Sequence, residues 1–541
     1  MGIVLHDPQI APRSTASGST ESQSGVRRRD WKPLYWLGAA LLLLVLQLLN
    51  GTDPLFAGLV FLFAFLSYRA VQAAGGLATL MGACIAFMAG QNVLVSQIAK
   101  VALGQAADSF LIRPVITICV YDLAMAGIWL AAVISTRWAA RRKPWFTAET
   151  DLKRLMWLSY ITMALAIVQM VVLGKRVDSE TGEMQVGGIF GPLGQASFLT
   201  PLAIASGTAH AILASKGRRS FGLVNTLMIL MLMGLGIVSA GREGMATGLV
   251  IYAATCLAFR FKFRPVHFAA AIGGACLLQF ILFPYALYAR SFVRTPDVSK
   301  NAARAVSCLM DVISDPIKYQ QIVDKESNKE SHYSYYGKAI PTLDRSSLIE
   351  GADAIVDATL THGTVGMETI TPGFYAAIPR MFYPDKPVGI KNTLAHRASK
   401  MVGKNDMTTG ITLGWVCDAF SSFGWAGAVL IPFLLSLVFF ASYRFVFDHR
   451  MAFNVVPIAL LFHLPWIFSG EAIASLISDI LQNVLFFAFS YGCITLLVNM
   501  AMRSEVRIRQ VKLQSQRGEM STMIRASVPR RRINPPDSRT G

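Results

Sequence analysis

Long apolar segments separated by short polar connections dominate the chain. Segments such as 34–49, 55–66 and 223–240 run almost without charge. One bilayer crossing needs roughly 20 apolar residues, so these segments have most or all of the required length. In lipid only helices and closed barrels satisfy every backbone polar group, and barrel strands alternate polar and apolar residues. Because these segments are continuous, the pattern predicts an all-α integral membrane protein with a polytopic bundle of helices.

The pattern divides the chain into about 12 transmembrane helices and one long polar interruption, at a spacing typical of bilayer crossings. Residues 1–33 read as a disordered cytoplasmic leader, and 500–541 as a basic, disordered cytoplasmic tail. Helices 1–9 fall within 34–288, a large extracytoplasmic loop covers 289–423, and helices 10–12 fall within 424–499. The predicted spans are 34–50, 54–73, 77–97, 113–135, 155–173, 197–214, 222–240, 244–260, 266–288, 424–446, 453–468 and 474–499.

The distribution of basic residues sets the orientation. The formal net charge is +18, and clusters such as 137–143, 216–219 and 260–264 fall in alternate connections, whereas the short connections between them carry few Lys or Arg. Basic residues collect on the cytoplasmic side of membrane proteins. We therefore expect an inner-membrane protein with both termini in the cytoplasm. Many of the positive charges lie in connections between predicted spans, where they reflect membrane orientation. The basic tail has no aromatic residues between its arginines, so nucleic-acid binding is not expected.

One apolar stretch must turn back on itself. Residues 221–259 have basic clusters at both ends and are about twice too long for one crossing. Gly241-Arg242-Glu243-Gly244 is the charged interruption near their middle. We therefore predict a turn there that places Arg242 at the outer membrane face.

The long loop is where we expect the chemistry, since loops of this length in compact proteins are usually functional. Its first part, 294–334, is polar and helix-prone, and 346–360 has the spacing of an amphipathic helix. That helix would either rest on the membrane surface or cap the bundle. Asp353 and Asp357 stand one helical turn apart, which suggests a solvated face. A disulfide between Cys308 and Cys417, both outside the predicted spans, is left open.

Several kinds of site are missing from the sequence. There is no Walker-type glycine-rich loop, HExxH, GxSxG or Cys/His cluster. We therefore expect no metal and no cofactor. What remains near the outer face is a set of arginines that suit phosphate binding: Arg242, Arg290, Arg345 and Arg380. The alternative reading is structural, with Arg242 paired to Glu243 or extended to the interface, and Arg290 anchoring a helix end.

The most specific segment is 373–387, GFYAAIPRMFYPDKP, whose prolines stiffen the backbone and whose aromatic rings suit sugar stacking. Its IPR-x-x-YPDKP phrase, late in a long outer loop, resembles the Wzy-type O-antigen and exopolysaccharide polymerases. Phe423-Gly424-Trp425-Ala426-Gly427 is similar to the family's nFG-x-x-G element, with Ser422 in place of Asn. The turn 240–244 resembles the family's Gly-Ser-Arg-Gly turn, with Glu243 inserted before the second glycine.

The resemblance implies a membrane glycosyltransferase that uses undecaprenyl-diphosphate-linked oligosaccharides and works beside a chain-length regulator and a flippase. It implies that Arg242, Arg290 and Arg380 hold the diphosphate, that Lys386 assists, and that Arg345 and Tyr383 belong to the substrate-binding set. A base must accept the proton of the acceptor hydroxyl. Spacing does not choose among the four candidates: His362, Glu368, Asp385 and His396.

Three other readings stay open. A flippase or other transporter would also use many helices and cations, but transporters commonly show internal repeats and mid-membrane ionisable groups. No repeat is evident, and Asp122 and Asp479 are the acids near mid-span. An O-antigen ligase would share the carrier chemistry but transfer the glycan to lipid A core. A structural or sensory role for the loop is the third.

Overall fold

The computed structural model describes residues 32–139, 142–174, 194–289, 298–315, 335–337, 347–378, 413–470 and 472–527, with 317, 319, 321, 383 and 399. Among these residues every regular element is a helix, and the extended pairing is limited to two isolated bridges. Eight helical stretches are long and apolar enough to cross a membrane. The all-helical membrane class is therefore confirmed, while the total of 12 crossings stays a prediction.

The eight stretches correspond to α2 (Pro54–Ala73), α3 to α4 (Leu80–Ala102), α5 (Pro114–Ala139), α6 (Leu152–Gly174), α8 (Leu199–Ala214, preceded by a 3-10 turn), α11 to α12 (Pro265–Ala289), α19 (Trp415–Val446) and α22 (Ile473–Ser527). Two shorter apolar helices are α1 (Lys32–Leu49) and α9 (Leu223–Val238). α10 (Arg242–Ala258) is antiparallel to α9 and packs against it, so the predicted fold-back is confirmed.

Local sequence explains where several helices begin. Asp53 accepts hydrogen bonds from the backbone amides of Leu55 and Phe56, and Pro54 supplies the first helical residue of α2. Thr79 caps α3 in the same way through the amide of Gly82. These side chains satisfy amides that have no partner within the helix itself, which fixes the boundary between connection and helix.

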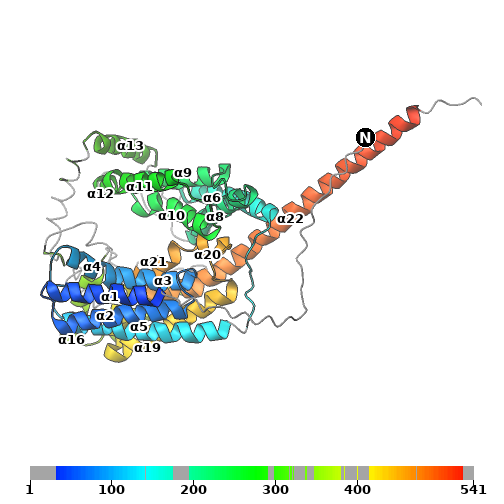
Figure 1. Ribbon diagram of the computed structural model, residues 1–541. Coiled ribbons are helices and arrows are strands. Elements are labelled where there is room, and N and C mark those ends of the chain that lie inside the picture. Colours follow the sequence, from blue (N-terminus) through cyan, green and yellow to red (C-terminus); the bar gives the residue numbers. More distant parts are fainter. Residues whose placement is uncertain are drawn as a thin grey trace, which may run out of the picture.

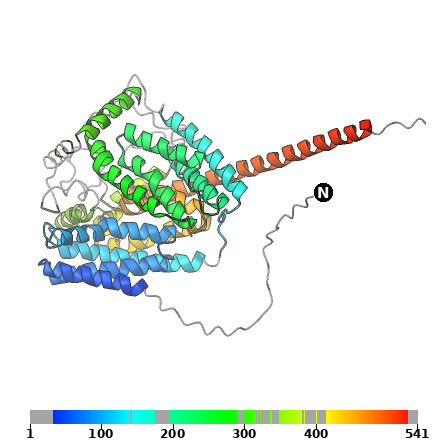
Figure 2. The same cartoon turned by 45° about the horizontal axis from the view of Figure 1, so that its top comes forward.

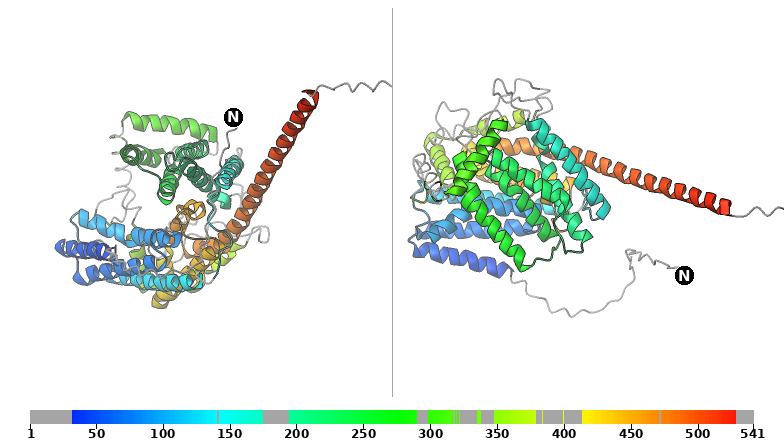
Figure 3. Two further views of the ribbon diagram at one scale, coloured as in Figure 1. Left: turned by 45° about the vertical axis from the view of Figure 1, so that its right-hand side comes forward. Right: turned by 90° about the horizontal axis from the view of Figure 1, so that it is seen from above.

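The helices run side by side, and the bundle has two distinct ends (Figure 1). α5 packs against α2 and α19, and α6 packs against α8. α4 and α16 (Ile349–His362) lie at one end, and α22 leaves the other end as a long projecting helix (Figure 2). The same separation is visible from the side and from above (Figure 3). We call these the loop end and the tail end.

Connections that were predicted to share the cytoplasmic side meet at the tail end. The amide of Leu80 donates to the carbonyl of His449 at 2.9 Å, and the amide of Phe146 donates to that of Val446 at 2.9 Å. The amide of Lys262 donates to the carbonyl of Gly217 at 3.3 Å. The structure therefore groups the connections as the basic residues suggested, although which side of a membrane they face remains a prediction.

The predicted span 453–468 is not a continuous helix. It is divided into α20 (Val455–Ala459), which packs on α8, and α21 (His463–Gly470), which packs on α3. Pro457 and Pro465 each stand in the first turn of one short helix, where a missing amide costs nothing. A single helix would have put Pro465 in its interior. The segment is correspondingly well buried.

The predicted boundary of the C-terminal tail was wrong. Residues 500–527, expected to be disordered, continue α22 as helix to Ser527, and 528–541 lie outside the described residues. This stretch is rich in Arg, Gln, Met and Ser with Glu at intervals, residues that tolerate helix well. The leader up to residue 31 also lies outside the described part of the chain.

The two cysteines of the long loop do not pair. Cys308 lies on α13 (Val298–Ser314), the helix expected in the polar first part of the loop, and Cys417 lies on the first turn of α19. Both are free and buried, and they belong to different hydrophobic clusters. The disulfide left open by the sequence is therefore not formed.

Candidate functional site

α16 caps the loop end of the bundle, one of the two positions expected for it. It packs on α19 and α5, and its Ile349, Ala352, Ile355 and Val356 are buried. The expectation that Asp353 lies on a solvated face was wrong, since its side chain is 2% exposed. Its carboxylate accepts hydrogen bonds from the amides of Ile112 and Arg113 and from the hydroxyl of Thr117.

Asp353 thus fixes the connection that leads into α5 (Ile112 and Arg113) and the first turns of that helix (Thr117) from a distant part of the sequence. Burial raises the pKa of its carboxyl, against the opposing effect of the three hydrogen bonds. Asp357, one turn further along, forms an ion pair with Arg113 at 2.8 Å in which both side chains are partly exposed. α16 is therefore fixed in place by buried polar contacts in addition to its apolar face.

The end of α16 presents two candidate bases on an anchored segment. His362 is the last helical residue, and both His362 and Glu368 are exposed. Between them, the amide of Val365 donates to the carbonyl of Ser421 at 2.9 Å. Thr369, at the end of the short helix η4 (Gly366–Thr369), shares a short hydrogen bond with Ser422. The segment is held against α19 while the imidazole and carboxylate stay accessible.

The segment 373–387 begins inside the bundle. α17 (Thr371–Ala377) packs against α22, with Gly373 close to the carbonyl of Ala474. The side-chain amide of Gln482 donates to the backbone carbonyls of Ala376 and Ala377, both at 2.8 Å. Tyr383 is partly exposed, and its ring centre lies 6.5 Å from that of Tyr375. Two aromatic rings therefore lie near one another beside the anchored helix.

The segment 423–427 forms a break near the start of α19. Phe423 and Gly424 leave the helical conformation, and Gly424 has a φ of 62° and a ψ of −140°. A Cβ on Gly427 would stand 2.1 Å from the carbonyl oxygen of Ala419. Both glycines are therefore required by backbone geometry, one by its conformation and the other by close approach. The break separates Trp415–Ser422, which carries the anchors of the loop, from the membrane-length part of the helix.

Arg242 lies in a second cluster. It is the first residue of α10, half-buried, with its guanidinium 5.5 Å from the centre of the Phe283 ring on α12. The tight approach of α9 and α10 depends on Gly236, since a Cβ there would meet the amide of Met245 at 2.6 Å. This cluster also includes Leu282 at the end of the π-helical turn η3 (Leu278–Leu282), Tyr285 and Ala286 of α12, and Ala305, Cys308 and Val312 of α13.

The described part of the chain thus accounts for four of the ten predicted site residues. His362, Glu368 and Tyr383 belong to the segments over α19 and α22, whereas Arg242 belongs to the α9–α10–α12 cluster. The remaining six candidates lie outside the described residues: Arg290, Arg345, Arg380, Asp385, Lys386 and His396. Within the described ranges, no group of three or more His, Cys, Asp or Glu side chains is arranged to hold a metal.

Sequence reasoning missed a buried cation at the loop end. Lys100 lies between the predicted spans 77–97 and 113–135, where a surface charge would be expected, yet it is fully buried near the end of α4 (Val95–Ala102). Its ammonium lies 4.2 Å from the Tyr335 ring centre and 4.7 Å from that of Phe110, and it donates to the Ser109 hydroxyl at 2.7 Å. It joins α4 to a short piece of the long loop. The aromatic residues Phe110 and Tyr335 were the features of the sequence that could have indicated a buried cation here.

Comparison of the chain with protein-family models, with curated proteins and with solved structures finds no match.

Proposed function

We propose that this chain is a membrane glycosyltransferase that polymerises oligosaccharide repeat units carried on undecaprenyl diphosphate. The observation that carries the proposal is a shared location. Two of the segments that resemble the Wzy-type polymerases are 373–387 and 423–427. The described part of the first, α17 with Ile378 and Tyr383, and the break at 423–427 lie at the loop end, where η4 contacts both α17 and α19. His362 and Glu368 are exposed on the same anchored structure. The product would be an O-antigen or an exopolysaccharide made at the outer face of the inner membrane.

The chemistry needs only a base and a cationic clamp. The acceptor sugar hydroxyl gives its proton to the base, and its oxygen forms a bond to the anomeric carbon of the donor. The bond from that carbon to the diphosphate oxygen breaks, and the diphosphate leaves with the electron pair. Guanidinium groups neutralise its developing charge, as oxyanion donors do in other enzymes. No metal is required in this scheme.

The roles follow the sequence candidates. The base is one of His362, Glu368, Asp385 and His396, and the first two are accessible at the loop end. Arg242, Arg290 and Arg380 form the diphosphate clamp, and Lys386 assists them. Arg345 and Tyr383 complete the substrate-binding set, with Tyr383 stacking on a sugar ring. The position of Arg242 supports its assignment to the clamp. It is the first residue of α10, and the free backbone amides at the start of a helix also attract an anion.

Replacing Arg242 with Gln should reduce chain elongation about 100-fold, the usual effect of losing one group that stabilises developing negative charge. In cells that depend on this chain, long glycans separated on a gel should collapse to single repeat units, with protein abundance in the membrane unchanged. Arg219→Gln is the matched control, because Arg219 is exposed near the opposite end of α9. Persistence of long glycans in Arg242→Gln would remove Arg242 from the clamp.

A transporter of lipid-linked oligosaccharide is a second candidate, and Asp122 favours it. This mid-span residue of α5 is 6% exposed, and both carboxylate oxygens are buried with no hydrogen-bond partner among the described residues. Intramembrane acids of this kind often mark transport pathways. Loss of a transporter traps repeat units on the cytoplasmic face, whereas loss of a polymerase leaves single units at the outer face. The side of the membrane on which repeat units accumulate in the Asp122→Asn variant therefore distinguishes a transporter from a polymerase. A ligase is distinguished by its product, a glycan joined to lipid A core.

A further inference from the structure

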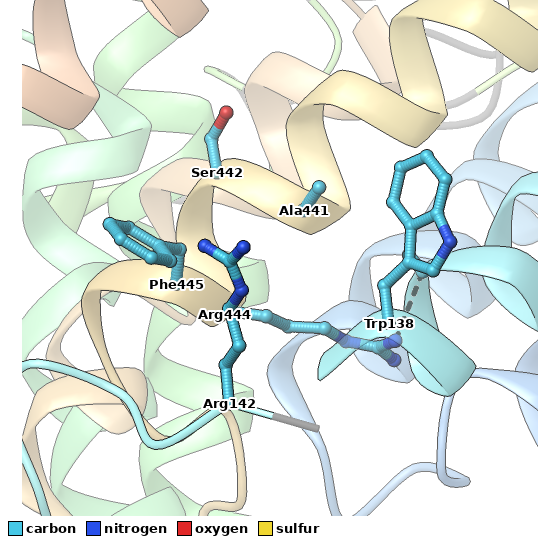
Figure 4. Close-up of a pocket in the computed structure, with 7 residues that line it drawn as sticks. Trp138, Arg142, Ala441, Ser442, Arg444 and Phe445 are labelled. Carbon is cyan, nitrogen blue, oxygen red and sulfur yellow. Dashed lines mark hydrogen bonds between the residues drawn. The ribbon is translucent and has the colours of Figure 1, made fainter. Parts of the chain in front are cut away.

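A cavity of about 570 Å³ opens between α5 and α19 at the tail end, away from the candidate site. The end of α5, the connection after it and the last turns of α19 enclose it (Figure 4). Arg142 reaches up toward Phe445 and Ser442, while Arg444 extends across toward α5 beneath Trp138 (Figure 4). The described lining residues are Ser135, Trp138, Arg142, Ala441, Ser442, Arg444 and Phe445.

Arg444 is the buried charge of this cavity, with only 4% of its surface exposed. One terminal nitrogen donates to the hydroxyls of Ser135 at 3.0 Å and Thr136 at 2.6 Å, and the other to the carbonyl of Ala74 at 3.0 Å. All three acceptors are neutral. The Nε atom is buried and has no acceptor among the described residues. Burying a guanidinium without an anion is costly, so the cavity presents an uncompensated positive charge.

The described residues that line the cavity add positive charge and no negative charge. Arg142 supplies a second guanidinium, and none of the described lining residues is acidic. In the adjoining α19–α20 connection, the pKa of His449 is lowered to about 4, first by burial and then by Arg444 and Arg450, against the opposing effect of Asp448. His449 is therefore neutral near pH 7, and two cations dominate the cavity.

The mouth of the cavity is apolar and aromatic. Trp138 is 57% exposed and Phe445 is 38% exposed, and both stand at the ends of membrane-length helices. Exposed tryptophan at a helix end is typical of the boundary between lipid and water. A ligand that fits must therefore carry an anionic head for the two guanidiniums and an apolar body beside the rings.

Guanidinium groups favour phosphate oxygens, and basic pockets between helices on the cytoplasmic side of a membrane suit phospholipid headgroups. We propose that this cavity binds the phosphate headgroup of an anionic phospholipid from the leaflet at the tail end, with Arg444 as the buried contact and Arg142 as the exposed one. This site is independent of the glycosyl transfer proposed for the loop end.

The test uses the full chain, purified in detergent and freed of native lipid. Phosphatidylglycerol, phosphatidylcholine and inorganic phosphate are added separately, and binding is followed by native mass spectrometry and by the melting temperature. Phosphatidylglycerol should bind and raise the melting temperature, and the other two should not. Arg142→Gln should weaken phosphatidylglycerol binding roughly fivefold, the effect of losing one basic contact to an anionic lipid.

Arg137→Gln is the matched control, because Arg137 is exposed in the last turn of α5 but does not line the cavity. Arg142→Gln is the informative variant because Arg142 is exposed, whereas Arg444→Gln would also disturb packing. Equal loss of binding in the Arg142 and Arg137 variants would overturn the site in favour of diffuse surface charge. Equal stabilisation by inorganic phosphate would overturn the lipid assignment.

Discussion

Replacing Gly427 with Ala should destabilise the protein by about 3 kcal/mol or more, at the upper end of the usual cost of overpacking. The added methyl would stand 2.1 Å from the carbonyl oxygen of Ala419, which belongs to the same helix and cannot move without breaking the turn at Phe423–Gly424. The melting temperature in detergent and the yield of monodisperse protein should both fall. Trp415–Ser422 would shift with the turn, and with it the anchors of the loop.

Gly58→Ala is the control for this change. Gly58 lies within α2, and no atom lies within 4 Å of a Cβ built there. Alanine favours a helix over glycine by roughly 1 kcal/mol, so Gly58→Ala should leave stability equal or slightly higher. If Gly427→Ala melts at the temperature of the unchanged protein while Gly58→Ala behaves as expected, the close contact between Gly427 and Ala419 is refuted.

Asp353→Ala should have the second large effect, a loss of about 3 kcal/mol or more. The substitution leaves two backbone amides and the Thr117 hydroxyl without their acceptor, and each unsatisfied buried group costs about 1–3 kcal/mol. α16 should loosen from the start of α5, which is measurable as faster amide hydrogen exchange in both segments. Asp353→Asn should be milder because the amide oxygen still accepts one of the bonds.

Asp357→Ala provides the matched control one helical turn away. Its ion pair with Arg113 joins side chains that are 27% and 50% exposed, so solvent screens it and its loss should cost no more than about 1 kcal/mol. Equal effects of the two alanine substitutions would show that Asp353 does not hold the start of α5 in place. A large effect confined to Asp353 would explain why the loop keeps its position over the bundle.

The sequence predicted the features that depend on local pattern. The fold-back at Arg242 follows from one charged interruption in a stretch too long for a single crossing, and the helix at 349–362 follows from the spacing of its apolar residues. Features that depend on distant partners were missed. Asp353 finds its donors about 240 positions earlier in the chain, so its spacing from Asp357 alone suggested a solvated face.

The candidate site was harder to predict for the same reason. Lys100 and Arg444 lie near helix ends, yet both side chains turn inward. Lys100 meets aromatic rings of neighbouring connections, and Arg444 meets hydroxyls of α5. Pro465 could have predicted the division of 455–470 into α20 and α21. The apolar character of the whole segment instead led to the prediction of one continuous span. His362, Glu368 and Tyr383 lie on or beside segments packed at the loop end, and their role in a site stays a prediction.

The division between α20 and α21 has a consequence for how the protein is built in the bilayer. The backbone between Ala459 and His463 lacks the complete ladder of bonds that lets a helix stand alone in hydrocarbon. It is tolerable at that depth only when other helices surround it, and here α8 and α3 do so. If this segment lies within the bilayer as the sequence predicted, its stability there depends on its contacts with α8 and α3.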